Sequence, residues 1–431
     1  MLRSTWRRFW AKFWALPVVS MLVATALVFL LLTLDHLGVS ARLANFSWPL
    51  DFSGDTAVET VNTLTSVIVA LMALFFSITL IVMTMAASSL GVRLVERWAN
   101  DRHIRVTLSL LMALLAFALI LQAAIDPNGP SERIPRLTIL ALLAGMVPAL
   151  SWLAIAFGHL SRRIHIDASI ADLGKDLRRD LGQLSRLSAR RDERTDWDDA
   201  RTLSACRSGY IDNIDMRRLI QTARDNGLQI RLPVSQGTYV HRDDCMLIVH
   251  GDAGEKIDEE VCRYVRISDY RSTDSKSTFS SALLAEIAAR ALSPAVNDVY
   301  TALGCIDHLG GGMADAFADQ NAGGWFGDDR GAVLHIPDLC PKGILERPLD
   351  ILRHAASDYP SASIRLLGML ERLADHATDS ASVVWLKRQA ELVANSALVS
   401  THAEKDEAAI REAREEVREA ESRPSKLRAA E

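Results

Sequence analysis

Four long apolar segments in the first 160 residues constrain the fold of this chain more than any other feature. A helix needs about 20 mostly apolar residues to cross the hydrocarbon core of a bilayer, and each segment reaches that length without an ionisable residue in its interior. A single run of this kind also fits a buried helix of a soluble protein. Four in succession, separated by short polar stretches, predict an α-helical membrane domain over residues 14–160, with spans at about 14–34, 61–87, 104–125 and 137–158.

The charges that flank these spans predict their orientation. Lys and Arg favour the cytoplasmic ends of membrane helices. They cluster before the first span, between the second and third, and after the fourth, whereas the first connection is mainly acidic. We therefore expect a multi-pass membrane protein with both termini in the cytoplasm.

The segment before the first span, residues 1–13, combines basic residues with tryptophans. Trp6, Trp10 and Trp14 recur every four residues, and tryptophan prefers the headgroup boundary of a bilayer. This spacing predicts an interfacial amphipathic helix. The apolar run that follows is longer than that of a cleaved signal peptide, which favours an uncleaved signal anchor.

The second span carries small or hydroxylated residues on one face. These residues fall on the two seam positions of a heptad, interrupted by Leu80, and two uses fit them. Small residues allow close helix packing, which is the simpler explanation, and hydroxyl groups can also line a narrow wet path. The face consists of Thr63, Ser66, Ala70, Ala73, Ser77, Thr84 and Ala87.

The fourth span has a similar row of small residues, Ala141, Gly145 and Ala149, beside Pro148. Such rows favour tight helix contacts within a chain or between subunits, and proline kinks a helix. Because four spans alone make a thin bundle, we expect a homo-oligomer embedded in the lipid bilayer.

The remainder of the 431-residue chain is far more polar and predicts a cytoplasmic α+β domain. The net charge of −5 argues against nucleic acid as a partner. Five cysteines without a CxxC pattern predict neither a disulfide framework nor a zinc site. Residues 161–200 predict an amphipathic linker helix followed by a charged loop, because apolar residues recur at three- and four-residue spacing from Ile166 to Leu187.

Residues 201–255 predict short strands around one short helix that ends at Gly227. Their order suggests a small barrel similar to a lipoyl or biotinyl domain. Carrier barrels of that type need a modifiable lysine, and none lies between Lys175 and Lys256. We therefore expect a structural or binding barrel, followed by an α+β and helical part over residues 256–400. The charged end, residues 401–431, predicts a solvated helix that frays into a disordered tail.

The stretch SPAVND, residues 293–298, should form a corner between two helices. Pro294 disfavours the α conformation at Ser293 and should break the first helix there. Asn297 or Asp298 can cap the second helix through a side-chain oxygen. We expect that second helix to end at the glycine run 310–312.

The same stretch resembles the signature of a bacterial membrane-protein family called domain of unknown function 2254. The similarity rests on ALSPAVNDVYTALGCIDHL at 291–309, and it extends to FFSITLIVMTMAASSLGVRLVERWANDR in the second span, to SGYIDNIDMRRL and to GTYV. Val299 stands where that family has a proline, and the arginine-threonine-aspartate pattern upstream is only partly present. The resemblance implies a membrane topology and no particular activity.

The corner could gather polar residues into a site. A Ser–His–Asp triad is disfavoured because no nucleophile-elbow pattern is present, and no ligand spacing supports a metal site. We therefore assign no catalytic, cofactor-binding or metal-binding residue. Capping with a buried polar network is the simplest role, and a pocket for an unknown cytoplasmic ligand or partner protein is the alternative. The candidate residues are Arg271, Glu286, Ser293, Pro294, Asn297, Asp298, Thr301, Asp307 and His308.

Three functions fit these features. An oligomeric channel-like or regulatory membrane protein with a cytoplasmic control domain is favoured by the second span and by the linker helix. A membrane-anchored sensor or scaffold would use the corner to bind a ligand or partner. A membrane-tethered enzyme is the least favoured, because no catalytic pattern supports it.

Overall fold

The computed structural model divides the chain into two compact units, residues Met1–His165 and Ile166–Glu431. Each unit is described by itself. The structure describes residues 14–37, 54–90, 101–126, 134–163, 166–189, 197–252, 254–270, 276–319 and 323–420. The predicted interfacial segment 1–13 lies outside these residues.

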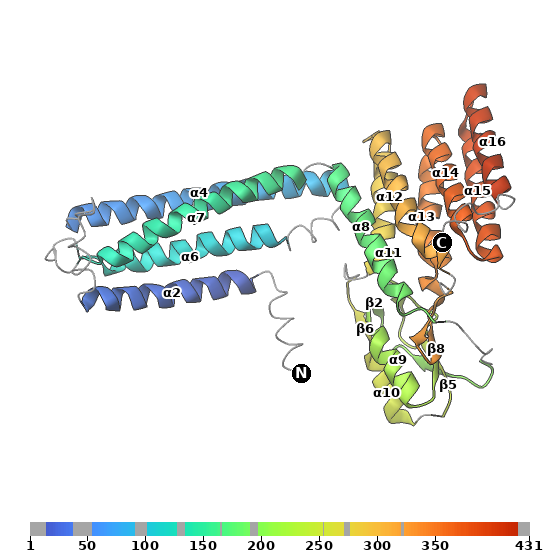
Figure 1. Ribbon diagram of the computed structural model, residues 1–431, viewed down its shortest axis with the longest axis horizontal. Coiled ribbons are helices and arrows are strands. Elements are labelled where there is room, and N and C mark those ends of the chain that lie inside the picture. The colour runs from blue at the N-terminus through green and yellow to red at the C-terminus, as the bar shows by residue number, and fades with distance from the viewer. Residues whose placement is uncertain are drawn as a thin grey trace. The chain divides into compact units, whose positions relative to one another are not determined.

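Among its described residues, the first unit has four helices that are long and apolar enough to cross a membrane. Consecutive helices run in opposite directions (Figure 1). The predicted membrane-spanning character is confirmed, although the second helix begins seven residues earlier than expected. The helices are α2 (Ala15–His36), α4 (Gly54–Leu90), α6 (Arg102–Ala124) and α7 (Arg136–Arg163).

Helix α6 packs against the other three helices and supplies much of the buried core of this unit. Gly145 of α7 faces it closely, because a Cβ at Gly145 would lie 3.2 Å from Leu114 Cδ2. At the C-terminal end of α2, the Asp35 carboxylate accepts hydrogen bonds from the backbone N–H groups of Leu137 and Thr138, at 3.2 and 3.1 Å. Asp35 therefore satisfies donors that the first turn of α7 leaves without partners.

The second unit contains two open β-sheets and a layer of helices. One sheet has the strand order β1-β5-β3-β8-β7 and the other β4-β2-β6. All pairings are antiparallel except that of β3 with β8. The strands are β1 (Arg201–Ser204), β2 (Gly209–Ile214), β3 (Gln229–Arg231), β4 (Tyr239–Val240), β5 (Cys245–His250), β6 (Val265–Ser268), β7 (Trp325–Asp328) and β8 (Gly331–His335).

The predicted barrel is wrong, since the described strands form two small sheets and close no barrel. The reason lies in pairing over long sequence distances. Strand β3 pairs with β8, about 100 residues further along the chain, through Ile230 opposite Leu334. A local strand pattern cannot reveal such a partner. The short helices α9 (Met216–Asp225) and α10 (Glu255–Arg263) accompany the sheets.

Seven further helices form the helical part of this unit, and α8 packs against both α11 and α12. The apolar stripe predicted for the linker helix is present, because Ile170, Leu173 and Leu177 of α8 are buried. The helices are α8 (Ile166–Ser185), α11 (Lys276–Ala291), α12 (Val299–Ala318), α13 (Pro341–Ala356), α14 (Pro360–His376), α15 (Ser380–Ser400) and α16 (Glu404–Glu419), with the short 3-10 helix η2 (Pro337–Leu339) before α13.

The glycine run does not end the corner's second helix, which corrects the expectation from the sequence. Helix α12 continues through Gly310, Gly311 and Gly312 to Ala318. A Cβ at Gly310 would lie 2.5 Å from Met369 Cγ of α14, and one at Gly312 would lie 2.8 Å from Leu177 Cδ2 of α8. The glycines therefore allow two neighbouring helices to approach α12 closely.

The charged C-terminal segment is also less solvated than its sequence predicts. Ile410 and Val417 of α16 are fully buried, and α16 packs against α14 and α15. An apolar residue every three or four positions is enough to bury one stripe of an otherwise charged helix. Residues 421–431 of the predicted tail lie outside the described part of the chain.

A Gly310→Ala exchange should destabilise the second unit, because its methyl group has no space beside Met369. Overpacking of this kind costs about 1–3 kcal/mol. The apparent Tm of the detergent-solubilised full chain should fall. Gly304→Ala is the matched control, because Gly304 lies on the same helix and a Cβ there would meet nothing within 4 Å. That variant should hold or raise the Tm, and equal losses in both variants would contradict the packing argument.

Candidate functional site

The face of α4 singled out in the sequence is exposed in the first unit. All six described seam residues with assigned exposure lie on it: Thr63, Ser66, Ala70, Ala73, Ser77 and Thr84. Ala87 is part of the helix, but its side chain lies outside the described set. The opposite side of α4 is buried in the bundle, through residues that include Val61, Ile68, Phe75 and Val82.

These two faces lie nearly opposite each other around the helix. At about 100° per residue, the seam residues fall within one narrow sector, and the buried residues fall on the far side of the axis. The small-residue face therefore does not serve packing within the described bundle. In a single copy, this face of α4 would be exposed to lipid.

The exposed face becomes strongly polar toward the start of α4. An open hollow there is lined by Asp55, Val58, Glu59, Asn62, Thr63, Ser66, Val67 and Ala70. The Ser66 hydroxyl donates to Asn62 O at 2.9 Å, and the Thr84 hydroxyl donates to Ile81 O at 2.8 Å. These hydroxyl hydrogens are thus satisfied within the helix, while the oxygen lone pairs can face water, an ion or another helix.

The corner between α11 and α12 forms as a turn, as the sequence predicts. Ser293 donates its hydroxyl to Arg290 O at 2.7 Å, while Pro294 and Asn297 are exposed. Asn297 has a φ of 51°, in the left-handed region that asparagine tolerates better than most residues. Its Oδ1 accepts a hydrogen bond from the Tyr359 hydroxyl at 3.3 Å.

Asp298 is the cap of α12. Its carboxylate accepts from Thr301 N at 3.1 Å and from the Thr301 hydroxyl at 2.6 Å. The polar groups of the corner are therefore engaged locally, as capping requires.

The remaining corner candidates do not converge on one point. Asp307 is exposed and pairs with Arg365 at 3.0 Å, away from the cap. His308 lies over α8, where a Cβ at Gly174 would come within 2.9 Å of its ring. Glu286 is half-buried on α11, and Arg271 lies outside the described residues.

The thiol nearest to the corner is poorly suited to nucleophilic chemistry. Cys305 is buried on α12, and burial raises the pKa of its thiol far above the ordinary value, with smaller contributions from Asp298 and Asp167. A thiol held protonated is a weak nucleophile. The corner thus offers caps and turns rather than a reactive group.

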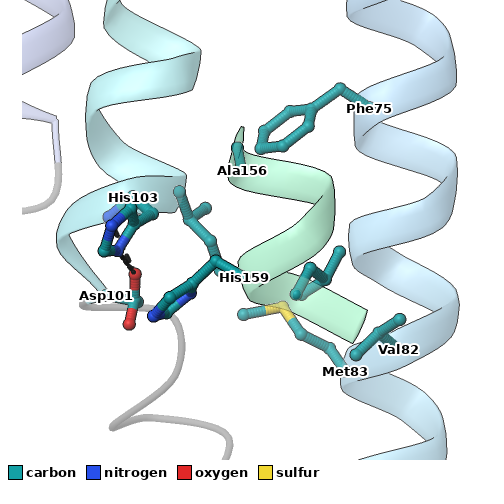
Figure 2. Close-up of a pocket in the computed structure, with 9 residues that line it drawn as sticks. Phe75, Val82, Met83, Asp101, His103, Ala156 and His159 are labelled. Carbon is teal, nitrogen blue, oxygen red and sulfur yellow. Dashed lines mark hydrogen bonds and ion pairs between the residues drawn. The ribbon is translucent and has the colours of Figure 1, made fainter. Parts of the chain in front are cut away.

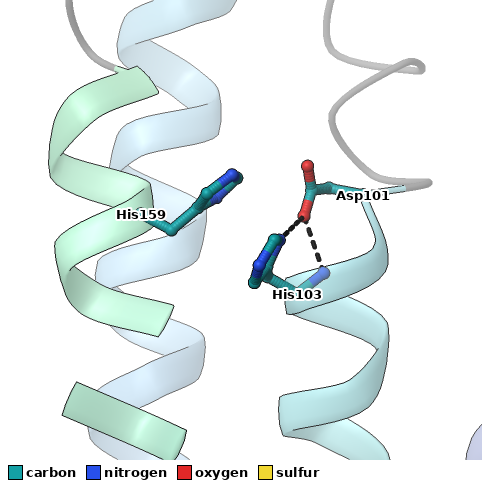
Figure 3. A group of neighbouring side chains, drawn as sticks. All are labelled: Asp101, His103 and His159. Atoms are coloured by element: carbon teal, nitrogen blue, oxygen red, sulfur yellow. Dashed lines mark hydrogen bonds and ion pairs between the residues drawn. The ribbon is translucent and has the colours of Figure 1, made fainter. Parts of the chain in front are cut away.

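A third group of polar side chains lies at the end of the first unit where α6 begins and α7 ends. Figure 3 shows Asp101, His103 and His159 facing one another from these two helices. Asp101 Oδ1 lies 3.3 Å from His103 Nδ1, and the rings of His103 and His159 stack with centroids 3.8 Å apart. One possible ligand atom from each residue lies within 4.8 Å of the others, so the three could hold a metal ion.

The sequence analysis missed this group because its members lie just outside the spans. His103 precedes the third predicted span and His159 follows the fourth. Consecutive spans run in opposite directions, so the start of one meets the end of the next. Two histidines in those positions were the available signal.

Asp298→Ala should lower the stability of the chain because α12 loses its cap. The expected loss is about 0.5–2 kcal/mol, seen as a lower apparent Tm in detergent. Asp298→Asn keeps an accepting oxygen and should retain most of the stability. Asp307→Ala, which removes an exposed ion pair worth at most about 1 kcal/mol, is the control. A larger loss in Asp307→Ala than in Asp298→Ala would contradict the capping role.

The fold and these sites define a multi-pass membrane protein with an additional α+β unit. The chain belongs to the family described as predicted membrane protein (DUF2254), whose model matches residues 10–372. An uncharacterized protein of Mycobacterium bovis and one of Mycobacterium tuberculosis are each 26% identical to it over 369 residues, covering 82% of this chain and 70% of theirs. No solved structure matches the chain.

Proposed function

We propose that the chain forms a homo-oligomer of the bacterial inner membrane in which the exposed faces of α4 line a narrow path for cations. The second unit lies in the cytoplasm and controls this path. The observation that carries the proposal is the two-sided character of α4. Its apolar stripe is used within the bundle, while the opposite face presents small, hydroxylated and acidic residues to the outside.

Lipid is a poor environment for that outer face. A polar side chain facing hydrocarbon is costly, and such groups usually face a protein partner or a water-filled cavity. Asn62 and Ser66 are exposed on the helix, and Asp55 and Glu59 lie toward its start. Neighbouring copies would cover this face, and the small residues would let the helices approach closely.

The charge on this face favours cations over anions. In a symmetric assembly, Asp55 and Glu59 of each copy would form acidic rings at one mouth of the path. Such rings concentrate cations and repel anions. Hydroxyl oxygens along the rest of the proposed path, from Ser66 to Thr84, would bind a passing cation weakly, so that the cation can leave again. A tightly closed contact between the same faces is the competing arrangement, and a flux measurement separates the two.

Ser77→Leu should remove most of the cation flux through vesicles that contain the purified protein. One leucine from each copy would place a circle of apolar side chains in a narrow path. Hydrophobic constrictions block conduction by excluding water. The measurement is K⁺ or Na⁺ flux across the vesicle membrane, followed with an ion-sensitive dye.

Ser151→Leu is the matched control, since Ser151 is exposed on α7 rather than on the seam. It should leave the flux unchanged. Glu59→Gln should reduce the preference for cations over anions. A wild-type protein that passes no cations, or a Ser77→Leu variant that conducts like the wild type, would refute the pore.

The proposed orientation has its own test. In intact spheroplasts, an external protease should leave the chain beyond residue 200 undigested, because that part would face the cytoplasm. After lysis the same protease should cut it. Digestion of this part before lysis would show that it lies outside the cytoplasm and would contradict the proposed orientation.

A further inference from the structure

Asp101, His103 and His159 carry an inference that is independent of the proposed pore. Asp101 is the cap of α6, where its Oδ1 accepts from His103 N at 2.7 Å. The same oxygen lies 3.3 Å from His103 Nδ1. His159 comes from the last turns of α7, and its ring stacks on that of His103 at an angle of 22°. Three metal-ligand side chains from two packed helices thus meet at one point.

A small cavity lies beside this group. Figure 2 shows the three side chains at one edge of a pocket whose other walls are apolar. The cavity measures about 20 Å³, and roughly 10–15 Å³ is enough for one water molecule. The cavity therefore has room for about one water molecule, which could serve as a further ligand of an ion held by the three side chains. The apolar lining consists of Phe75, Val82, Met83, Ile104, Ala156 and Leu160.

A hydrogen-bonded link joins the two helices next to His103. Trp152 Nε1 of α7 donates to the Thr107 hydroxyl of α6 at 3.2 Å, and that hydroxyl donates to His103 O at 2.7 Å. The Trp152 indole also lies nearly parallel to the His103 ring, with centroids 5.9 Å apart. Ligands on rigid, cross-linked helices lose little freedom when they bind an ion.

One separation within this group, that of Asp101 Oδ1 and His103 Nδ1, matches the spacing of two ligands on a small transition-metal ion. Bond lengths of about 2.0–2.2 Å to nitrogen and oxygen place two ligand atoms of a tetrahedral site about 3.3 Å apart, which is the separation of Asp101 Oδ1 and His103 Nδ1. The stacked ring of His159 must turn edge-on to direct a nitrogen at the same point. The χ2 torsion of histidine has a broad profile, which permits this rotation once the ring gives up its stacking on His103.

We propose that Asp101, His103 and His159 bind one divalent transition-metal ion of the zinc class, leaving a fourth position for water. Two imidazoles and one carboxylate suit Zn²⁺, Co²⁺ or Ni²⁺ better than Mg²⁺ or Ca²⁺, which prefer oxygen ligands. The ion ties the start of α6 to the end of α7, at the end of the bundle from which the chain continues into the second unit.

Co²⁺ is the probe for this site, because it replaces zinc and its visible absorption bands report the coordination. The full chain is purified in detergent without a histidine tag and titrated with CoCl₂. We expect one Co²⁺ per chain, with a spectrum typical of nitrogen and oxygen ligands, and displacement by Zn²⁺.

His103→Ala and His159→Ala should weaken binding by more than the roughly 10–100-fold that the loss of an outer hydrogen-bonding partner costs. Asp101→Asn keeps an oxygen to cap α6 but removes the negative charge, so it should weaken binding while the helix stays intact. His36→Ala is the matched control, because His36 is a histidine of the same unit in the last turn of α2. It should bind Co²⁺ like the wild type.

Three results would overturn the proposal. The first is a wild-type chain that binds no Co²⁺. The second is binding of equal strength in the wild type, His103→Ala and His159→Ala. The third is an intense near-ultraviolet band typical of thiolate ligands, which would place the ion at cysteines. If a histidine variant fails to fold, as judged by circular dichroism and gel filtration, the Co²⁺ affinity of Asp101→Asn tests the proposal instead. Affinity equal to that of the wild type would then overturn it.

Discussion

The absence of water in the hydrocarbon core of a bilayer is the constraint on which the first unit depends. Every backbone polar group there must be satisfied within the protein, which selects helices. The same absence removes the hydrophobic effect as a force between helices, so association relies on close packing and hydrogen bonds. Helix α6 shows the packing, since it lies against all three other helices. Asp35 shows the hydrogen bonding, since it satisfies the start of α7.

Helix α4 has a different role under this constraint. One stripe of it belongs to the bundle, but the small and hydroxylated residues of its seam face away from the described bundle. An assembly of several copies would resolve this asymmetry, and a polar path along the shared axis is the use that fits both the hydroxyl groups and the acidic start. The two histidines and Asp101 lie at the other end of the bundle, where α6 begins. The proposed path and the proposed metal site are thus separate features of one unit.

Glycine determines how closely the helices of the second unit approach. Gly174 of α8 lies against His308, Gly312 of α12 lies against Leu177, and Gly310 lies against Met369 of α14. A side chain at these positions would push the helices apart. The helix propensity lost at each glycine, about 1 kcal/mol relative to alanine, is offset by this closer packing. The signature stretch 291–309 therefore builds a capped corner and leads directly into the glycine-rich helix surface.

The sequence by itself determined the four apolar helices, the small-residue face of α4 and a capped corner at Asn297 or Asp298, because each depends on residues near one another along one helix. It failed for the barrel, for the end of the second corner helix and for the buried stripe of the C-terminal helix. Strand β3 pairs in parallel with β8, which lies far along the chain. Gly310 leaves space for the Met369 side chain of another helix. Ile410 is buried against neighbouring helices. Only the tertiary structure brought Asp101 and His103 to His159. Contacts between distant segments depend on how whole elements pack, and a local pattern of residue types carries no record of that packing.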